Sequence, residues 1–326
     1  MKRRDVIASI GVTLAALPAI IRAQAGKIPT VGHLWHAGSA QEEEPFYSAL
    51  REGFARVGYR EGRTLNLVHR FPNETPERFR TMAEELVAMN VDVLMGGSVG
   101  SVYLKRATSR IPIVFMFVAD PVGLKLVNSL AQPGGNATGL SNFGRDIAGK
   151  RLQLLKELVP SLERVGFLIN PGLPATSMYV DVMNEAAVQL KLKLQTFEAR
   201  SLEEMAPAFD AMVKARMQAA TIAQGGTAFQ ARHINPKLAL DRRLPFLAFS
   251  RETFEGGALA AYGPSNIEAL YRSAVFVDKI LKGASPGKLP VELPTEFELL
   301  INLKIAKLLG LTVPAALRLR ATEVIE

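Results

Sequence analysis

Apolar and polar residues follow two patterns along this chain: continuous apolar runs and helix-like periodicity. Residues 111–118 are almost unbroken apolar, which is typical of a strand in a parallel sheet covered on both faces. In residues 43–57 the apolar positions recur as on one face of an amphipathic helix. The first half of the chain is therefore predicted to form strands over 28–36, 65–71, 91–95, 111–118 and 137–141, and helices over 43–57, 76–89, 99–108 and 120–130.

The same alternation restarts at Asp146. The second half is predicted to form strands over 165–170, 192–199, 219–224, 245–250 and 258–262, and helices over 147–159, 175–190, 202–214, 228–240 and 266–281. Two such blocks in tandem, in a chain longer than one usual core, predict an α/β fold with two doubly wound parallel-sheet lobes.

Small polar residues follow the predicted strands. In doubly wound sheets, ligands bind beyond the carboxyl ends of the strands. Gly, Ser and Thr there let a ligand approach the amides of helix N-termini, although such residues also serve tight turns. The predicted ligand-binding residues are His36, Ser39, Ser98, Val99, Asp120, Asn142, Asn170, Thr176, Gln224, Thr227, Ser250 and Tyr262.

Two of these positions suggest a chemistry. Ser98, with the amides of Val99 and Gly100, could hold a carboxylate at a helix N-terminus. Asp120 ends a buried strand and has two interpretations: it pairs with a ligand ammonium group, or it is the N-cap of the helix predicted after Pro121. Tyr262 and His36 could form flat walls.

The first 25 residues have the features of a signal peptide. Lys2, Arg3 and Arg4 precede an apolar run over 6–21, and Ala23-Gln24-Ala25 gives the small-x-small pattern of a cleavage site. A membrane anchor or a buried first helix is the alternative. We expect export to a periplasm, with cleavage near Ala25; the sequence leaves the choice between the general and the twin-arginine route open.

Cysteine and charge narrow the functional class. The chain has no Cys, so neither a disulfide framework nor a lipidated Cys is expected. Loss of residues 1–25 would lower the net charge from +8 to +5. This charge is spread along the chain, which does not indicate nucleic-acid binding.

Gly96-Gly97-Ser98-Val99-Gly100 fits the G-x-S-x-G pattern between a strand and a helix, as in a serine hydrolase. Asp210 and His233 follow in the right order. However, His233 lies in a predicted helix and not in a loop after a final strand. A hydrolase that uses Ser98 is therefore an alternative and not the main prediction.

Other chemical motifs are incomplete. Residues 144–150 resemble a phosphate loop, but Arg151 stands where Ser or Thr would hold magnesium. No glycine fingerprint for a dinucleotide follows the first strand. The four histidines lack metal-ligand spacing. We expect no catalytic residues, no cofactor and no metal.

Several longer motifs resemble the substrate-binding proteins of ABC transporters, in particular the group with tryptophan- and tyrosine-binding members. The likeness spans nearly the whole chain and rests on residues 54–62 (FARVGYREG), 111–115 (IPIVF), 120–123 (DPVG), 130–139 (LAQPGGNATG), 150–152 (KRL), 262–265 (YGPS), 294–302 (PTEFELLIN) and 306–311 (AKLLGL).

This resemblance implies a periplasmic binding protein of type I, with lobes joined by three crossovers near 141–145, 258–262 and 291–295. Lobe 1 would comprise 26–141 and 262–293, and lobe 2 would comprise 142–261. Residues 294–326 would form the third crossover and a tail whose lobe stays open. The chain departs from the family where Ser98-Val99 replaces Thr-Pro, where Ala261 replaces Ser, and at His36-Ala37, which puts transfer of a ligand in doubt.

The expected function is capture of a small ligand, an amino acid or a small aromatic or organic acid, between two lobes that close by a hinge motion. The expected partner is the inner-membrane permease of an ABC importer, and the protein is expected to act as a monomer. Besides the hydrolase, a periplasmic ligand sensor is the alternative.

Overall fold

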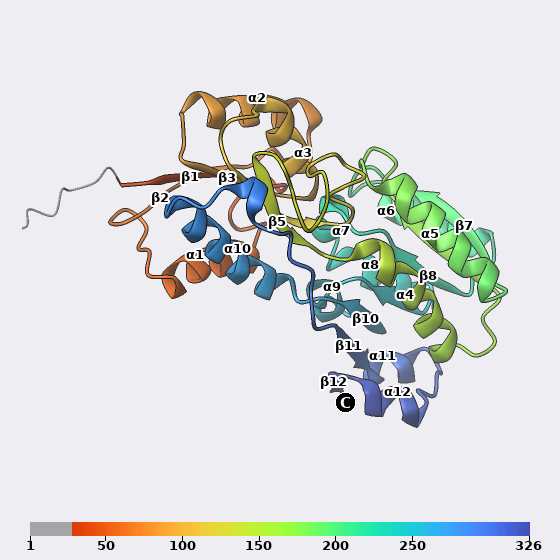
Figure 1. Ribbon diagram of the computed structural model, residues 1–326. Helices are drawn as coiled ribbons and strands as arrows, with labels where there is room; N and C mark the ends of the chain where they lie inside the picture. Colours follow the sequence, from red (N-terminus) through yellow and green to blue (C-terminus); the bar gives the residue numbers. More distant parts are fainter. Residues whose placement is uncertain (1–27) are drawn as a thin grey trace, which may run out of the picture.

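The computed structural model describes residues 28–326, with the side chain of Arg145 excepted; the predicted signal peptide lies outside the described residues. Two sheets form two lobes, side by side in Figure 1. This confirms the predicted class, an α/β fold with two parallel-sheet lobes. No helix within residues 28–326 is long and apolar enough to cross a membrane.

Lobe 1 is built on a five-stranded parallel sheet in the order β2-β1-β3-β4-β5. Helices α1 and α10 cover one face, and α2 and α3 cover the other. The elements are β1 (Thr30–Leu34), α1 (Phe46–Arg56), β2 (Asn66–Arg70), α2 (Pro76–Ala88), β3 (Val93–Gly97), α3 (Ser98–Ala107), β4 (Ile113–Val118), β5 (Ala137–Ser141), α10 (Asn266–Leu281) and the 3-10 turn η1 (Pro286–Lys288).

Lobe 2 is built on a seven-stranded sheet in the order β12-β11-β10-β9-β8-β6-β7, in which only the β10–β11 pair is antiparallel. Its elements are α4 (Gly144–Leu158), β6 (Arg164–Ile169), α5 (Thr176–Gln189), β7 (Lys193–Glu198), α6 (Met205–Lys214), β8 (Ala219–Ile222), α7 (Gly226–Gln230), α8 (Ile234–Asp241), β9 (Phe246–Ala248), α9 (Arg251–Glu255), β10 (Ala260–Gly263), β11 (Glu298–Asn302), α11 (Leu303–Leu308), α12 (Ala315–Arg320) and β12 (Glu323–Ile325).

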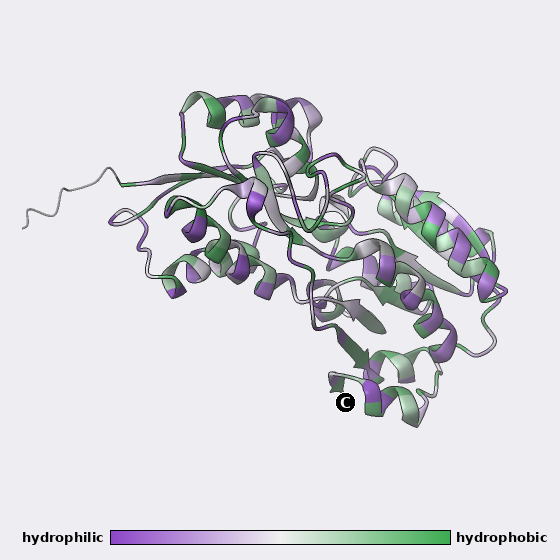
Figure 2. Cartoon of the chain, viewed as in Figure 1, coloured by the Kyte–Doolittle hydropathy of each residue, from purple (hydrophilic) through white to green (hydrophobic). Residues whose placement is uncertain are grey.

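Each sheet is buried on both faces, and each face has its own apolar cluster. Figure 2 shows the consequence: most strands are hydrophobic, while the helices carry hydrophobic residues inward and hydrophilic ones outward. Burial on both faces is the reason why the strands read as apolar runs in the sequence.

The chain passes between the lobes three times: from β5 to α4, from β10 to α10, and from η1 to β11. The boundary expected at residue 262 falls inside β10, which belongs wholly to the second sheet. The tail, whose lobe the sequence left open, adds β11 and β12 to lobe 2. There Arg251 pairs with Glu298 at 2.7 Å and with Glu323 at 2.6 Å.

Two predicted helices differ from the structure. The helix expected over 120–130 is wrong, since residues 121–125 form turns and Lys125 adopts a left-handed φ of 57°. The helix expected over 228–240 is divided into α7 and α8. Pro236 in the first turn of α8 has no amide hydrogen, so one continuous helix would lose a bond there.

Substitutions at Gly139 in β5 and at Gly58 after α1 test how closely β4 and β5 pack in lobe 1. Both have positive φ, 151° and 90°. A Cβ at Gly139 would collide with the backbone of Phe115, whereas nothing lies near Gly58. We expect Gly139→Ala to lower the free energy of unfolding by about 2–4 kcal/mol and Gly58→Ala by about 1 kcal/mol. Urea unfolding measures both, and equal losses would contradict the close approach of β4 and β5.

Candidate ligand-binding cleft

The carboxyl ends of the strands of both sheets meet at the junction of the lobes, where three hollows open. The hinge-side hollow, of about 590 Å³, is lined by residues of all three crossovers: Phe117, Leu140, Ser141, Asn142, Pro264, Ser265, Asn266, Glu268, Ala269, Arg272 and 292–296. The rim-side hollow, of about 710 Å³, is lined by Gln41, Glu42, Asn73, Glu74, 200–203, Thr227, Gln230, Arg232 and His233. A third, of about 240 Å³, lies between Asp120–Leu124 and the start of α5.

Hydrogen bonds join the crossovers that line the hinge-side hollow. The Asn142 amide donates to the carbonyl of Phe117 at 3.1 Å and accepts the amide of Gly144 at 3.0 Å. Glu292 takes part in backbone hydrogen bonds with β5 and pairs with Arg272 of α10 at 2.7 Å. These bonds attach the first and third crossovers to lobe 1 along one wall of the hinge-side hollow.

An aromatic contact separates the hinge-side and rim-side hollows. Phe229 of α7, in lobe 2, stacks on Phe46 of lobe 1 with ring centres 4.5 Å apart, and Phe46 stacks on Phe117 at 5.4 Å. The guanidinium of Arg232 lies 4.2 Å from the Phe229 ring and donates to the carbonyl of Glu44 at 3.1 Å. Phe229 is only 3% exposed, so lobe 2 inserts a ring into lobe 1.

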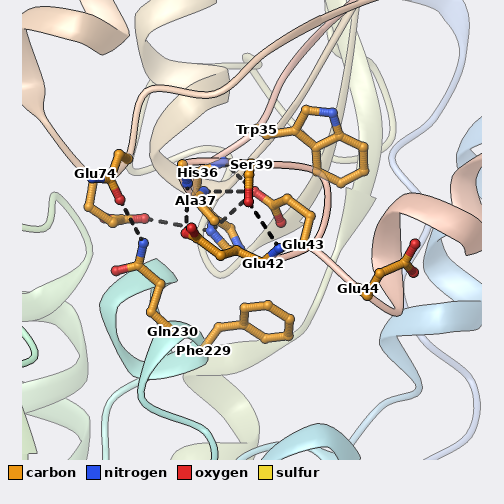
Figure 3. A network of polar contacts seen from close by, with 12 residues as sticks. Trp35, His36, Ala37, Ser39, Glu42, Glu43, Glu44, Glu74, Phe229 and Gln230 are labelled. Carbon is orange, nitrogen blue, oxygen red and sulfur yellow. Dashed lines mark hydrogen bonds and ion pairs between the residues drawn. The ribbon is translucent and has the colours of Figure 1, made fainter.

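Next to this ring lies a small acidic network, shown in Figure 3. The Glu43 carboxylate, fully buried, accepts the amides of His36 and Ala37 at 2.9 and 2.7 Å and so shapes the end of β1. His36 Nδ1 lies 3.4 Å from Glu43 and 3.9 Å from Glu74. The His36 ring meets the Phe229 ring edge-on at 5.2 Å.

In lobe 2, three of the predicted residues are linked to one another. Asn170 donates to the hydroxyl of Thr227 at 2.9 Å, and Thr176 donates to the carbonyl of Asn170. They connect the end of β6 to α7 and to the first turn of α5. Ser250 is the buried N-cap residue of α9, but its side chain makes no capping hydrogen bond to the helix backbone; its hydroxyl lies 3.4 Å from that of Thr253.

Tyr262 lies near the end of β10. Its ring stacks on Phe297 of the third crossover at 5.9 Å, and its carbonyl accepts a bond from the Arg151 Nε at 2.8 Å. Gln224, half-buried, lies in the segment between β8 and α7. Gln224 thus follows β8, whereas Tyr262 lies within β10, one residue before its end.

Arg151 of α4 is a buried cation that the sequence analysis did not place in the site. It also donates to the carbonyl of Phe249 at 3.4 Å, and among the described residues no carboxylate pairs with it. Burial lowers its pKa to about 10. The ends of β9 and β10 therefore carry a positive charge without a counter-ion in the described part of the chain.

In lobe 1, Ser98 and Val99 occupy the first turn of α3, half-buried, and Ser98 has a φ of 41°. Ser39 accepts the amide of Glu42 at 3.3 Å and stabilises the loop after β1.

Of the twelve predicted residues, Asn142 lines the hinge-side hollow, Thr227 the rim-side hollow and Asp120 the third.

The residues of a hydrolase are not assembled around Ser98. Asp210 pairs with Arg242 at 2.7 Å and is 68% exposed. His233 is the N-cap residue of α8 and lines the rim-side hollow. Within residues 28–326 no hydrogen bond or ion pair joins Asp210 to His233. No group of His, Asp and Glu in the same range could hold a metal ion.

Four residues that shape the junction, Phe229, Glu43, Glu74 and Arg151, were missing from the prediction. Phe229 occupies an ordinary apolar helix position, and Glu43 lies in an acidic run that resembles a solvated surface. Only Arg151 had a signal, because it belongs to one of the motifs that carry the family resemblance. The other three depend on contacts between distant segments.

Asp120 tests the two interpretations that the sequence left open. Its carboxylate accepts the amide of Gly123 at 2.8 Å, so it stabilises a turn, although the helix that it was expected to cap is absent. We expect Asp120→Asn to preserve the free energy of unfolding, and Asp120→Ala to lower it by about 1 kcal/mol. Urea unfolding of both variants measures this. Equal stability of wild type and Asp120→Ala would leave the ammonium-binding interpretation as the better one.

Phe229 tests the contact between the lobes. We expect Phe229→Ala to favour the open form, because the ring is buried only while the lobes touch. Small-angle scattering of the ligand-free protein should show a larger radius of gyration. Phe209→Ala is the matched control: that ring lies in the core of lobe 2, so its loss should cost about 3–5 kcal/mol of stability without opening the lobes. An unchanged radius in Phe229→Ala would contradict this role.

Comparison with known proteins identifies the fold and its class. The profile of the family described as ABC transporter substrate binding protein matches residues 40–325. A tyrosine-binding protein of Clostridioides difficile (strain R20291) is 25% identical over 265 residues, which cover 80% of this chain and 76% of that protein.

Two solved structures are similar over almost the whole chain. A conserved domain protein from Vibrio cholerae is 29% identical with a TM-score of 0.85, and covers 91% of this chain and 100% of its own. The ABC domain from Streptococcus pneumonia in complex with L-Trp is 25% identical with a TM-score of 0.84, at 92% and 100% coverage. With the two-lobed fold and its cleft, the family match over residues 40–325 shows that the chain belongs to the ABC transporter substrate-binding proteins.

Proposed function

We propose that this protein captures an amino acid or a small aromatic acid between its lobes, in a periplasm, and delivers it to the permease of an ABC importer. The observation that carries this proposal is the hinge-side hollow. Its volume of about 590 Å³ falls within the range typical of small-molecule sites. Residues from all three crossovers line it, so one ligand there would touch every segment that moves when the lobes close.

Aromatic side chains support a flat ligand. Phe117 lines the hollow, and beside the crossovers Phe297 stacks on Tyr262 and lies 6.4 Å from Phe143. Aromatic rings bury large apolar areas with defined stacking geometries. The tyrosine-binding relative and the neighbour solved with L-Trp agree with this choice.

Charges in the cleft support a ligand with a carboxylate. The first turn of α3 offers backbone amides beside Ser98, and helix N-termini favour anions. Arg151 of lobe 2 adds a buried positive charge at the ends of β9 and β10, behind the surface of the hollows, and no described carboxylate pairs with it. A carboxylate bound at the junction would be attracted by the amides of lobe 1 and by the positive charge of lobe 2, which would favour closure.

A panel of ligands tests the proposal by thermal shift. A ligand that binds only the folded protein, at 100 times its Kd, stabilises it by about 2.7 kcal/mol. We expect aromatic amino acids or small aromatic acids to raise the Tm by several degrees, and the corresponding decarboxylated amines to raise it much less. A response to sugars or polyamines alone would contradict the carboxylate argument.

Ester hydrolysis is the control for the alternative function. Ser98 has no assembled partners in the described part of the chain, so we expect no turnover of ester substrates. Turnover that disappears in Ser98→Ala would overturn the binding-protein proposal, whatever the thermal shifts show.

A further inference from the structure

Glu74 occupies an unusual place at the junction of the lobes. It follows β2 in the loop that leads to α2, with a left-handed φ of 51°, and its side chain is only 13% exposed. Its Oε1 atom is buried without a hydrogen-bond partner. The α7 backbone of lobe 2 covers it: a Cβ added to Gly226 would collide with the Glu74 carboxyl group.

The surroundings give this carboxyl group little compensation. His36 Nδ1 lies 3.9 Å away, beyond hydrogen-bonding distance, and Glu43 on the far side of His36 adds a second negative charge. Across the rim-side hollow the charged and titratable side chains are Glu42, Arg200, Glu203, Arg232 and His233. On the lobe 2 side, the backbone of Gly226 lies against the carboxyl group and brings no charged side chain to it.

The pKa of Glu74 is raised to about 7, mainly because the group is buried; His36 opposes this rise and Glu43 adds to it. Part of this burial exists only while α7 lies on the carboxyl group. If the lobes separate, Glu74 returns to water and its pKa falls toward the ordinary value of a glutamate.

We propose that Glu74 controls closure of the ligand cleft. Lobe 2 packs against the Glu74 carboxyl group when that group is protonated, so closure takes up a proton. This inference rests on the proposed function, since closure is the step that traps the ligand. It adds a residue that acts through the contact between the lobes and not through the ligand.

The sign of the pH dependence follows from linkage. A group whose pKa is higher in the closed form favours closure fully below its open-form pKa, and this contribution is lost as the pH rises through its closed-form pKa. Closure should therefore be favoured near pH 5 and weaken as the pH rises through 7. The equilibrium between open and closed forms should change by at most about tenfold per pH unit, and by less where the open form still buries part of Glu74.

Small-angle scattering of the ligand-free protein at pH 5.5 and pH 8 tests this, with no ligand needed. We expect wild type to be more compact at pH 5.5, and Glu74→Gln, a neutral mimic of the protonated acid, to be compact at both. Glu84→Gln, an exposed glutamate on α2, is the matched control and should behave as wild type. Gly226→Ala should remain open at both, because its methyl group pushes α7 away.

Two results would overturn the proposal: equal compactness of wild type at both pH values, or a pH response that persists in Glu74→Gln. If that persistent response disappears in His36→Asn, His36 and not Glu74 is the titrating group. Circular dichroism melts confirm that each variant is folded.

The ligand is tested separately with L-tryptophan. Its Kd should rise about tenfold or more from pH 5.5 to 8 in wild type and stay constant in Glu74→Gln. Failure of L-tryptophan to bind at either pH would count against the proposed function, while the scattering result would still decide on Glu74.

Discussion

Parallel strands place all their carboxyl ends at one edge of a sheet, and this constraint determines the rest of the molecule. In each lobe that edge collects the loops with Gly, Ser, Thr and Asn. Three passages of the chain between the lobes then hold the two edges face to face. The cleft exists because both sheets obey the same rule, and its hinge-side wall exists because the passages are adjacent, with Asn142 and Glu292 joining them to lobe 1.

The sequence predicted what local patterns determine. Apolar runs identified most strands, and strand ends identified Asn142, Thr227 and Asp120, each of which lines a hollow. It failed where long-range contacts decide. The segment over 298–302 could have paired with several sheet edges, and the ion pairs of Arg251 with Glu298 and Glu323 join residues far apart in the chain. Phe229 and Glu74 were missed because their roles arise only when the other lobe arrives.

The charges of the cleft are distributed unequally between the walls. Lobe 1 buries two carboxyl groups, Glu43 and Glu74, around one histidine. Lobe 2 buries the guanidinium of Arg151 against backbone carbonyls. Buried charges without partners are costly for a protein, since water no longer solvates them. Their concentration at the junction is more typical of a working site than of a surface selected only for stability.

The order of the elements along the chain also has a consequence for biosynthesis. Lobe 1 receives its covering helix α10 only after the first five strands of lobe 2 have been made, and lobe 2 receives β11 and β12 only from the last thirty or so residues. A chain that emerges from the ribosome N-terminus first therefore leaves both cores open to water until translation is nearly complete.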